Sequence, residues 1–418
     1  MFLIYRFFIN IIFLFSPLII VFRLLKKKES LKRFKEKFCF FSKKKIKGKL
    51  IWFHGASVGE INSIIPLLEK LNNDKRISQI LITTNTLSAE KIVSGIKLKK
   101  ITHQFFPIDI NYLVEKFINY WKPSVAFFID SEIWPNMLDN LNKKKIPIIL
   151  LNARISKKSF KRWNKLKYFS KEIFRKINLC IVSNKESKNY LKLLGAKNIK
   201  NIGNLKFTQT KNYDFKLNEN LINFYKNKKI WCASSTHNKE EEIIAKAHIK
   251  LKSKHPKLLT IIIPRHINRI NEIKHKIEDL GLKVDVGKSP KKIHHKIDIF
   301  LVNSYGKTKS FFLICKNVFL GGSLIDHGGQ NPIEAVTMGC KTLHGPNVYN
   351  FREIYTFLKE NKFSYKVKNE KEIFNYFNKE WSKKNRAINM KNELNQISKK
   401  ILLNTLREID LYINCNAI

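Results

Sequence analysis

Short apolar runs alternate with longer segments of helical spacing from about residue 49 onward. After the first run, Ile61, Ile64, Ile65 and Leu68 recur at the spacing of one helix face. Strands that alternate with helices predict parallel sheets covered by helices on both faces. The runs that we interpret as strands span residues 50–53, 80–84, 125–129, 147–151, 179–183, 230–234, 258–264, 298–302 and 317–322.

These strands fall into two series, with an apparent boundary near residues 203–211. A chain of 418 residues is too long for one ordinary core and suits two domains. We therefore predict an α/β protein with two doubly wound domains facing a cleft. Ligands of such sheets bind beyond the carboxyl ends of the strands. The Lys- and His-rich segment 283–296 is interpreted as an exposed loop.

The N-terminal segment 2–22 is strongly apolar and contains one charged residue, Arg6. Its uncharged run is slightly shorter than the ~20 residues that a bilayer requires, and Pro17 interrupts it. It either spans a membrane marginally or lies in the interface, and no small-residue cleavage site follows it. A core helix is the less favoured alternative, because the segment is apolar all round. The Lys and Arg residues that follow predict that the bulk of the chain lies on the cytoplasmic side.

The charge balance is extreme, with 80 Lys and Arg against 33 Asp and Glu. The lysines are spread along the chain rather than gathered into one stripe, which argues against a nucleic-acid binder. A basic surface of this kind favours an anionic bilayer and phosphorylated substrates as partners. The six cysteines form no C-x-x-C pair and predict buried thiols in a reducing compartment.

Two loops of the first half carry candidate catalytic acids. Glu60 follows a glycine-bracketed turn at a helix start, where it either complements the helix dipole or acts as a general base. On position alone the first role is favoured. Asp130 and Glu132 follow a strand, and they either orient a hydroxyl or cation, or serve as one helix cap and one surface acid. Pro135 suits the first turn of the next helix.

Loops of the second half carry candidate phosphate ligands. Ser234, Ser235 and Thr236 precede an acidic helical run and either bind phosphate oxygens or cap that helix. Arg265 follows an apolar strand and has the planar guanidinium that suits phosphate. The sequence contains no G-x-x-x-x-G-K-[ST], G-x-G-x-x-G or H-E-x-x-H motif. Phosphate binding is therefore expected to rest on glycine turns, Arg, Lys and helix starts, without a metal.

The segment GGQNPIEA reads as another helix start. Asn331 is expected to be its N-cap, Pro332 its first residue and Glu334 the reach-back acid of a capping box. The functional alternative for Glu334 is a carboxylate that binds ribose hydroxyls.

Taken together, these strings resemble the family of 3-deoxy-D-manno-octulosonic acid (Kdo) transferases of lipopolysaccharide synthesis. Their order and spacing cover most of residues 50–355. The matching strings are HGASVGE (54–60), DSEIWPN (130–136), NARISKKS (152–159), GNLKF (203–207), SSTHNKEEE (234–242), PRHINR (264–269), GGSLIDHGGQNPIEA (321–335) and GPNVYNFREI (345–354).

The resemblance implies a GT-B fold, with the acceptor on the first Rossmann-like domain and CMP-Kdo on the second. It implies that Glu60 is the general base, and that Asp130 and Lys206 stabilise the transition state. The positions that match CMP-contacting stretches are Arg265, His266, Tyr305, Gly306, Lys307, Asn331, Pro332, Ile333 and Glu334.

The chain departs from the family pattern at several positions. Asp130 stands where the family has Glu, and Lys307 replaces an acid in the segment 303–307. Gln330 stands where His is usual, and residues 267–268 read Ile-Asn in place of Pro-Glu. A backbone contact to CMP in the segment 303–307 survives such a change, whereas a carboxylate contact does not.

The resulting expectation is an inverting glycosyltransferase that moves Kdo from CMP-Kdo to a hydroxyl of a lipid A precursor, lipid IVA, and releases CMP. Its expected partners are that donor, that acceptor and the anionic surface of the bacterial inner membrane, with no cofactor and no nucleic acid. The alternatives are a GT-B enzyme that uses a UDP-sugar and a non-catalytic basic membrane- or nucleic-acid-binding protein. The expected domains are a membrane anchor (1–25), an acceptor domain (26–207), a CMP-Kdo domain (208–395) and a C-terminal helix that returns to the first domain (396–418).

Overall fold

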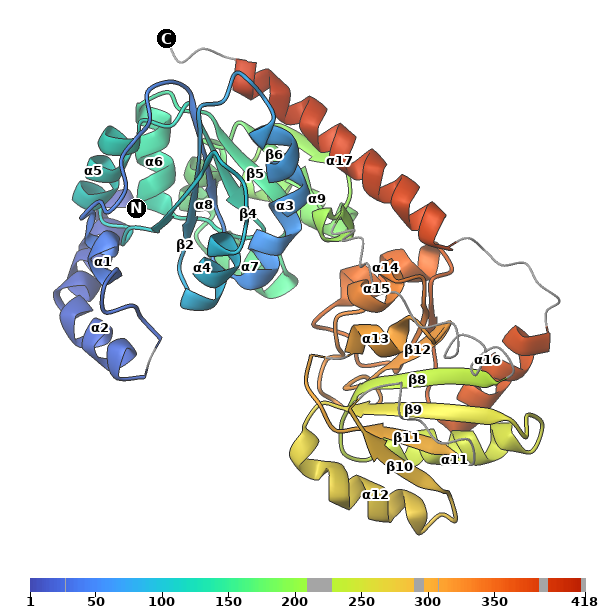
Figure 1. The fold of residues 1–418 in the computed structure, drawn as a ribbon. Helices are drawn as coiled ribbons and strands as arrows, with labels where there is room; N and C mark the ends of the chain where they lie inside the picture. The colour runs from blue at the N-terminus through green and yellow to red at the C-terminus, as the bar shows by residue number, and fades with distance from the viewer. Residues whose placement is uncertain (27, 209–227, 289–296, 307, 383–389, 415–418) are drawn as a thin grey trace. The chain divides into compact units, whose positions relative to one another are not determined.

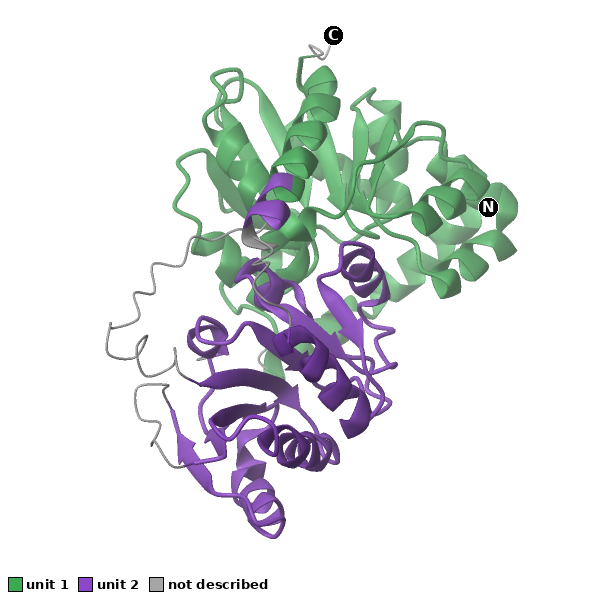
Figure 2. Ribbon diagram, turned by 90° about the vertical axis from the view of Figure 1, so that its right-hand side faces the viewer, with its two compact units in different colours: residues 1–209, 397–418 green, residues 210–396 purple. Residues whose placement is uncertain are grey.

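The computed structural model describes residues 1–26, 28–208, 228–288, 297–306, 308–382 and 390–414. The chain divides into two compact units. Unit 1 comprises residues 1–209 and 397–418, and unit 2 comprises residues 210–396 (Figure 2).

Unit 1 contains a seven-stranded parallel sheet in the order β3-β2-β1-β4-β5-β6-β7. Because β1 pairs with β2 on one side and with β4 on the other, the strand order reverses between β1 and β4. The strands are β1 (Leu50–His54), β2 (Gln79–Thr84), β3 (Ile101–Phe105), β4 (Val125–Ile129), β5 (Ile148–Ala153), β6 (Leu179–Val182) and β7 (Ile199–Asn201).

Helices cover both faces of this sheet, with α5 and α6 on one side and α3 on the other (Figure 1). On the α5 side, Trp52 packs against Phe117 and Phe128 in a fully buried aromatic cluster. The helices are η1 (Phe34–Phe38), α3 (Val58–Asn72), α4 (Leu87–Ser94), α5 (Asn111–Trp121), α6 (Pro135–Lys143), α7 (Lys157–Lys165), α8 (Lys167–Phe174), α9 (Lys185–Leu194) and η2 (Leu205–Thr208).

The apolar N-terminal segment forms two helices, α1 (Phe2–Leu14) and α2 (Ser16–Leu25), bent by 51° just before Pro17. In the described part of the chain no single helix is long and apolar enough to cross a bilayer, although this bent pair together has the length and composition. Most of its large apolar side chains are exposed, including Leu3 at 79% and Phe7 at 62%. The helices α1 and α2 therefore have an exposed apolar surface.

Unit 2 contains a second seven-stranded parallel sheet, in the order β10-β11-β9-β8-β12-β13-β14. Here the strand order reverses between β8 and β12. Both units are doubly wound α/β domains, as predicted. The strands are β8 (Lys229–Thr236), β9 (Leu258–Pro264), β10 (Val284–Gly287), β11 (Ile299–Val302), β12 (Asn317–Leu320), β13 (Lys341–His344) and β14 (Ser364–Lys366).

One helix layer of unit 2 contains α11, α12 and α16, and the other contains α13, α14 and α15. The interpretation of 283–296 as a loop was wrong for its first part, because β10 pairs with β11 there; residues 289–296 lie outside the described residues. The helices are α11 (Glu240–Lys252), η3 (Ile267–Arg269), α12 (Ile270–Glu278), α13 (Thr308–Phe312), α14 (Ile333–Thr337), α15 (Arg352–Glu360) and α16 (Glu370–Ser382).

The last helix, α17 (Met390–Asn414), packs on unit 1 over most of its length. The ammonium of Lys49 donates to the carbonyl of Ile413 at 2.6 Å, and Arg76 forms an ion pair with Asp410 at 2.6 Å. Gly203 lies so close to Ile401 that a Cβ would come within 3.0 Å of that side chain. The C-terminal residues thus complete the first unit.

Candidate active site

Glu60 lies in the first turn of α3, which follows β1. The Ser57 side chain caps this helix, and the Glu60 carboxylate accepts hydrogen bonds from the Ser57 hydroxyl and the Ala56 amide, both at 2.7 Å. This arrangement is a variant of the capping box, in which the acid reaches the amide of Ala56, one residue before the N-cap. Glu60 therefore does stabilise the start of α3, and the same hydrogen bonds hold its carboxylate in one orientation.

The electrostatic surroundings of Glu60 favour proton exchange near neutral pH. The pKa of its carboxyl is raised to about 7, chiefly by burial and also by the negative charges of Glu132 and Asp130. The hydrogen bonds from Ser57 and Ala56 act in the opposite direction. A carboxyl with a pKa close to the working pH is suited to general base catalysis.

Asp130 and Lys206 form an ion pair beyond the carboxyl end of β4. The Lys206 ammonium lies 2.8 Å from the Asp130 carboxylate, and the Asn152 amide donates to the other carboxylate oxygen. The Asn152 side-chain oxygen in turn accepts from the backbone amide of Leu205, one residue before Lys206. Asp130 and Asn152 both have positive φ angles, 56° and 53°, in the left-handed region where Asp and Asn are better tolerated than most residues.

Glu132 is held by two ring nitrogens. His54 Nε2 lies 3.2 Å from the Glu132 carboxylate, and the Trp134 indole donates to the same oxygen at 2.9 Å. Burial lowers the pKa of His54, against the smaller raising effects of Glu132 and the Thr83 carbonyl. Burial alone would raise the pKa of Glu132, but its bonds to His54 and Trp134 hold it below the usual value. Glu132 is therefore an oriented anion.

The interpretation of Asp130 or Glu132 as a cap of α6 was wrong. The N-cap of α6 is Trp134, which makes no capping side-chain bond, and Pro135 begins the helix as expected. Asp109, from the connection between β3 and α5, instead accepts from the amides of Asn136 at 3.1 Å and Met137 at 2.9 Å. Asp130 and Glu132 remain available at the edge of the sheet.

In unit 2, the turn between β8 and α11 is built around Glu240, which is fully buried. Its carboxylate accepts from four backbone amides, those of His237, Gly322, Ser323 and Leu324, at 2.7–3.1 Å. The glycine loop after β12 is therefore already bound by a carboxylate of the same unit. Gly321 permits this packing, since a Cβ there would lie 2.3 Å from the Ser235 carbonyl oxygen.

Basic and imidazole groups gather beside this loop. Arg265 and His266 follow β9 and are exposed. The His237 ring centroid lies 6.0 Å from that of His266 and 4.3 Å from that of His327. The pKa of His237 is lowered to about 4, chiefly by burial and then by the positive potential of His327, His266 and the nearby arginines. A positive potential at the carboxyl edge of a parallel sheet suits an anionic ligand.

The expected helix start at residues 331–334 differs in detail. Pro332, rather than Asn331, is the N-cap of α14, and Asn331 accepts from the Ile333 amide at 3.1 Å. Glu334 is exposed and forms an ion pair with Lys309 at 3.0 Å, so it does not serve as the reach-back acid. Ile333 and Pro332 are buried and position this turn.

The segment after β11 is less constrained. Tyr305 is 64% exposed, and Gly306 follows it with a φ of 75°. Lys307 lies outside the described residues. Over the described ranges, no group of three or more His, Cys, Asp or Glu side chains is arranged to hold a metal ion.

Comparisons with known proteins identify the family of this chain. A family profile described as "3-Deoxy-D-manno-octulosonic-acid transferase (kdotransferase)" matches residues 32–209. The 3-deoxy-D-manno-octulosonic acid transferase of Rickettsia bellii is 34% identical over 376 residues, which cover 87% of this chain and 87% of the relative. The transferase of the same name from Haemophilus influenzae is 31% identical over 320 residues, 74% of each chain. This chain belongs to the Kdo transferase family.

Solved structures agree with the fold of a Kdo transferase of GT-B type. A UDP-GlcNAc 2-epimerase from Neisseria meningitidis matches with a TM-score of 0.57 and 13% identity, covering 86% of this chain and all of that one. A glycosyltransferase from Rickettsia africae matches with a TM-score of 0.54 and 13% identity, covering 89% and 100%. At these identities the likeness concerns the fold alone. The predicted pair of Rossmann-like domains is confirmed.

Sequence reasoning missed three residues that shape the site of this Kdo transferase. His54 and Asn152 stand in strings that match the family, but the sequence does not predict a role for them, since a His or Asn at a strand end can serve many purposes. Glu240 was seen only as part of an acidic helix start, whereas the fold uses it to bind a loop some 80 residues further along the chain. Only the pairing of β8 with β12 brings these segments together.

Proposed function

We propose that this chain is an inverting glycosyltransferase that moves Kdo from CMP-Kdo to a hydroxyl of the lipid A precursor lipid IVA and releases CMP. Membership of the Kdo transferase family supports the transfer of Kdo in lipopolysaccharide synthesis. The observation that carries the mechanism is the oriented Glu60 carboxyl with a pKa of about 7, beside the Asp130–Lys206 pair.

In this proposal Glu60 removes the proton from the acceptor hydroxyl. Ser57 and Ala56 fix the carboxylate, so little reorganisation accompanies proton transfer. Attack on the anomeric carbon forms the new C–O bond as the bond to the CMP phosphate breaks. One base and a direct displacement, without a covalent intermediate, invert the anomeric configuration.

Asp130 and Lys206 act in this proposal on the charge that develops in the transition state. Their ion pair at 2.8 Å keeps an ammonium group at the edge of the sheet, and the side chains of Asp130 and Lys206 are 15% and 21% exposed. A preorganised charge in a partly dehydrated site stabilises developing charge more effectively than one in water. Although Asp130 is one methylene shorter than the usual Glu, it still reaches Lys206.

We assign the donor to unit 2. Because Glu240 accepts from the amides of residues 322–324, those amides are not free to bind phosphate. The phosphate of CMP-Kdo would therefore rely on the side chains of Arg265 and His266. Tyr305, Gly306 and Lys307, together with Asn331, Pro332, Ile333 and Glu334, form the proposed contacts to the rest of CMP. The proposal includes no metal and no cofactor.

The exposed apolar surface of α1 and α2 supports a location at the inner membrane. Such a surface, followed by many lysines, suits an anionic bilayer. The acceptor of this proposal resides in that bilayer, and the catalytic units would lie on its cytoplasmic face.

Mass spectrometry of the lipid products tests the proposed function directly. The full chain is incubated with CMP-Kdo and a tetraacylated lipid A precursor, and the products are expected to carry one or more added Kdo residues. A parallel reaction with UDP-sugars serves as the specificity control. Transfer from a UDP-sugar, or competition by UDP but not by CMP, would replace the proposed donor.

A further inference from the structure

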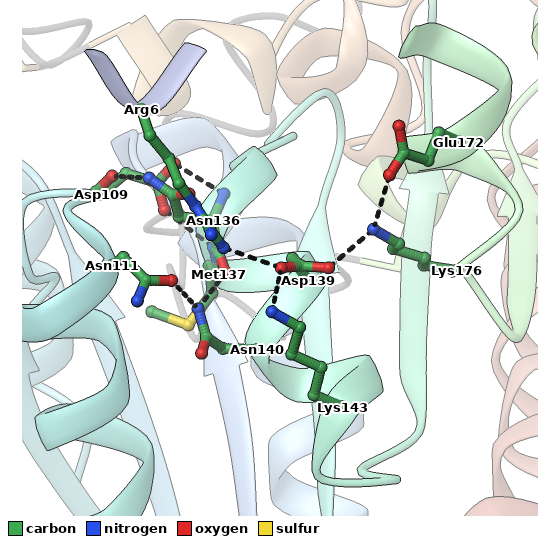
Figure 3. Close-up of polar contacts among 10 residues, drawn as sticks. All are labelled: Arg6, Asp109, Asn111, Asn136, Met137, Asp139, Asn140, Lys143, Glu172 and Lys176. Atoms are coloured by element: carbon green, nitrogen blue, oxygen red, sulfur yellow. Dashed lines mark hydrogen bonds and ion pairs between the residues drawn. The ribbon is translucent and has the colours of Figure 1, made fainter. Parts of the chain in front are cut away.

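The first helix of the chain makes specific polar contacts with α6 (Figure 3). The Arg6 guanidinium donates from Nε to the Asn136 side-chain oxygen at 3.1 Å and from Nη2 to the Asp139 carboxylate at 2.9 Å. Asn136 is fully buried and Asp139 is 7% exposed. These bonds span 130 and 133 residues of sequence and engage two positions one turn apart on α6.

Tyr5 reaches the same helix start through Asp109. Its hydroxyl donates to the Asp109 carboxylate at 2.8 Å, and that carboxylate binds the first amides of α6. Asp109 is 1% exposed, and its backbone carbonyl also accepts from the Asn136 side chain at 2.6 Å. A buried carboxylate requires such donors, because an unpaired charge inside a protein is strongly unfavourable. Tyr5 thus supplies one of the three donors to this carboxylate that the structure describes.

The two faces of α1 differ sharply. Phe2, Tyr5, Arg6 and Phe13 face the protein, where Phe2 meets the Phe169 ring at 5.3 Å. The opposite positions are apolar and exposed, including Phe8 at 59% and Ile12 at 54%. A helix that served only as a tether would not need the polar face.

The start of α6 follows directly on the loop that carries Asp130 and Glu132. Only residues 130–134 separate the end of β4 from Pro135, and the last of them, Trp134, donates to Glu132. A displacement of the first turn of α6 therefore moves this short loop. A positional error of about 1 Å in a catalytic group reduces rates by up to roughly 100-fold.

We propose that Tyr5 and Arg6 are positioning residues: they fasten α1 to the first turn of α6 and thereby hold the loop of Asp130 and Glu132 in its active geometry. This inference rests on the proposed function for its effect on catalysis. It makes the membrane-facing helix a structural part of the acceptor unit, so that turnover depends on α1 even without a bilayer.

The test uses the full chain with the lipid acceptor dispersed in detergent, so that recruitment to a bilayer plays no part. We expect Arg6→Gln to lower kcat by roughly 10- to 100-fold, with little change in the KM for CMP-Kdo. Arg6→Lys keeps one bond to Asp139 and is expected to restore part of kcat. Arg23→Gln is the matched control, since Arg23 forms an ion pair with Glu29 at 2.7 Å in the same N-terminal segment but has no contact with α6 among the described residues.

Amide hydrogen exchange of residues 130–142 gives a readout that does not depend on activity. Tyr5→Phe and Arg6→Gln are expected to speed exchange there while leaving unit 2 unchanged. Wild-type exchange and wild-type kcat in detergent for both variants would overturn the positioning role and leave α1 as a tether.

If the wild-type chain transfers no Kdo, the proposed function fails, whereas the exchange measurement still decides whether α1 orders α6. A variant that unfolds globally is recognised by accelerated exchange in both units, and Tyr5→Phe, which removes a single hydroxyl, then decides.

Discussion

Both units contain a seven-stranded parallel sheet whose strand order reverses at one point, although β11 lies between β9 and β10 in unit 2, whereas β2 and β3 of unit 1 are adjacent. The side chains beside the two reversal points differ in charge. In unit 1 the edge between β1 and β4 presents three carboxylates, Glu60, Asp130 and Glu132, each fixed by neighbouring donors. In unit 2 the edge beside β8 presents Arg265 and imidazole rings, while the Glu240 carboxylate is buried beneath the loop. The two sheets thus present carboxylates at one reversal point and basic groups at the other.

The difference arises from the direction in which each helix-start acid points. Glu60 and Glu240 both lie in the first turn of the helix that follows the first strand of their unit. Among the described residues, Glu60 bonds to Ser57 and Ala56 of its own turn and is partly exposed, whereas Glu240 binds amides of a distant loop and is fully enclosed. The environment of an acid at a helix start therefore depends on which distant segment the sheet places beside it: the loop after β12 encloses Glu240.

Glu60→Gln removes the carboxylate that we propose as the general base in unit 1, and it has the largest expected effect. Turnover should fall by roughly 10²–10⁴-fold, because glutamine keeps the shape but cannot take the proton. CMP affinity and melting temperature should barely change. Glu69→Gln on the exposed end of α3 is the control. A near-wild-type rate, with only a small loss of stability, would leave Glu60 with its helix-start role alone.

The pH dependence sharpens the same assignment. Because burial raises the pKa of Glu60 to about 7, the active carboxylate is lost as the pH falls below 7. We expect kcat/KM to rise with pH up to about 7 and to fall about tenfold per unit below it, which is roughly 100-fold at pH 5. Stopped assays over pH 5–9 provide the measurement, and this acidic limb should be missing from the residual activity of Glu60→Gln. A limb centred near the ordinary value for Glu would contradict the burial argument.

Glu240→Gln tests the structural member of the pair. A glutamine has one acceptor oxygen and turns an NH₂ group toward backbone amides, so the loop after β12 loses bonds to a charge. We expect the free energy of unfolding to fall by about 1.5–3 kcal/mol, and CMP affinity to fall with it. Thermal unfolding and calorimetry measure the two effects. The neighbour Glu242, paired with Lys276 at 3.6 Å, provides the control Glu242→Gln, and a Glu240→Gln chain of unchanged stability would refute the structural role.

The buried strands of both sheets could be predicted from the sequence, and the polar edge strands could not. The strands of VAFFI and LLTIIIP begin and end where expected, since a strand buried on both faces reads as a continuous apolar run. The missed strands are short or polar and lie toward sheet edges: β3, β7, β10, β13 and β14. Their pairing partners hold them in the sheet, and this is tertiary information.

Residues of the candidate site could be predicted where they stand in a family motif. They could not be predicted where tertiary contacts override the local rules for helix starts. Asp130 and Lys206 were assigned together by resemblance, and they lie 2.8 Å apart. By contrast, local rules made Asp130 or Glu132 a helix cap, while a distant carboxylate, Asp109, binds that helix start. The N-terminal segment likewise read as apolar all round, yet Tyr5 and Arg6 give α1 a polar face that only its contacts reveal.

Arg265→Ala has the smallest expected effect of the four, because the side chain is exposed and water screens its charge. A charge-assisted hydrogen bond to phosphate contributes about 1.5–3 kcal/mol when it is well enclosed. For an exposed guanidinium we expect about 1 kcal/mol, or roughly a fivefold weaker CMP affinity by calorimetry, with an unchanged melting temperature. Lys274→Ala on the neighbouring helix α12, where Lys274 pairs with Glu278 at 3.7 Å, removes one exposed positive charge away from the loop and serves as the control. Equal affinity in the two variants would show that general positive charge, and not Arg265 itself, attracts the donor, and the anion site of unit 2 would then have to rest on other groups.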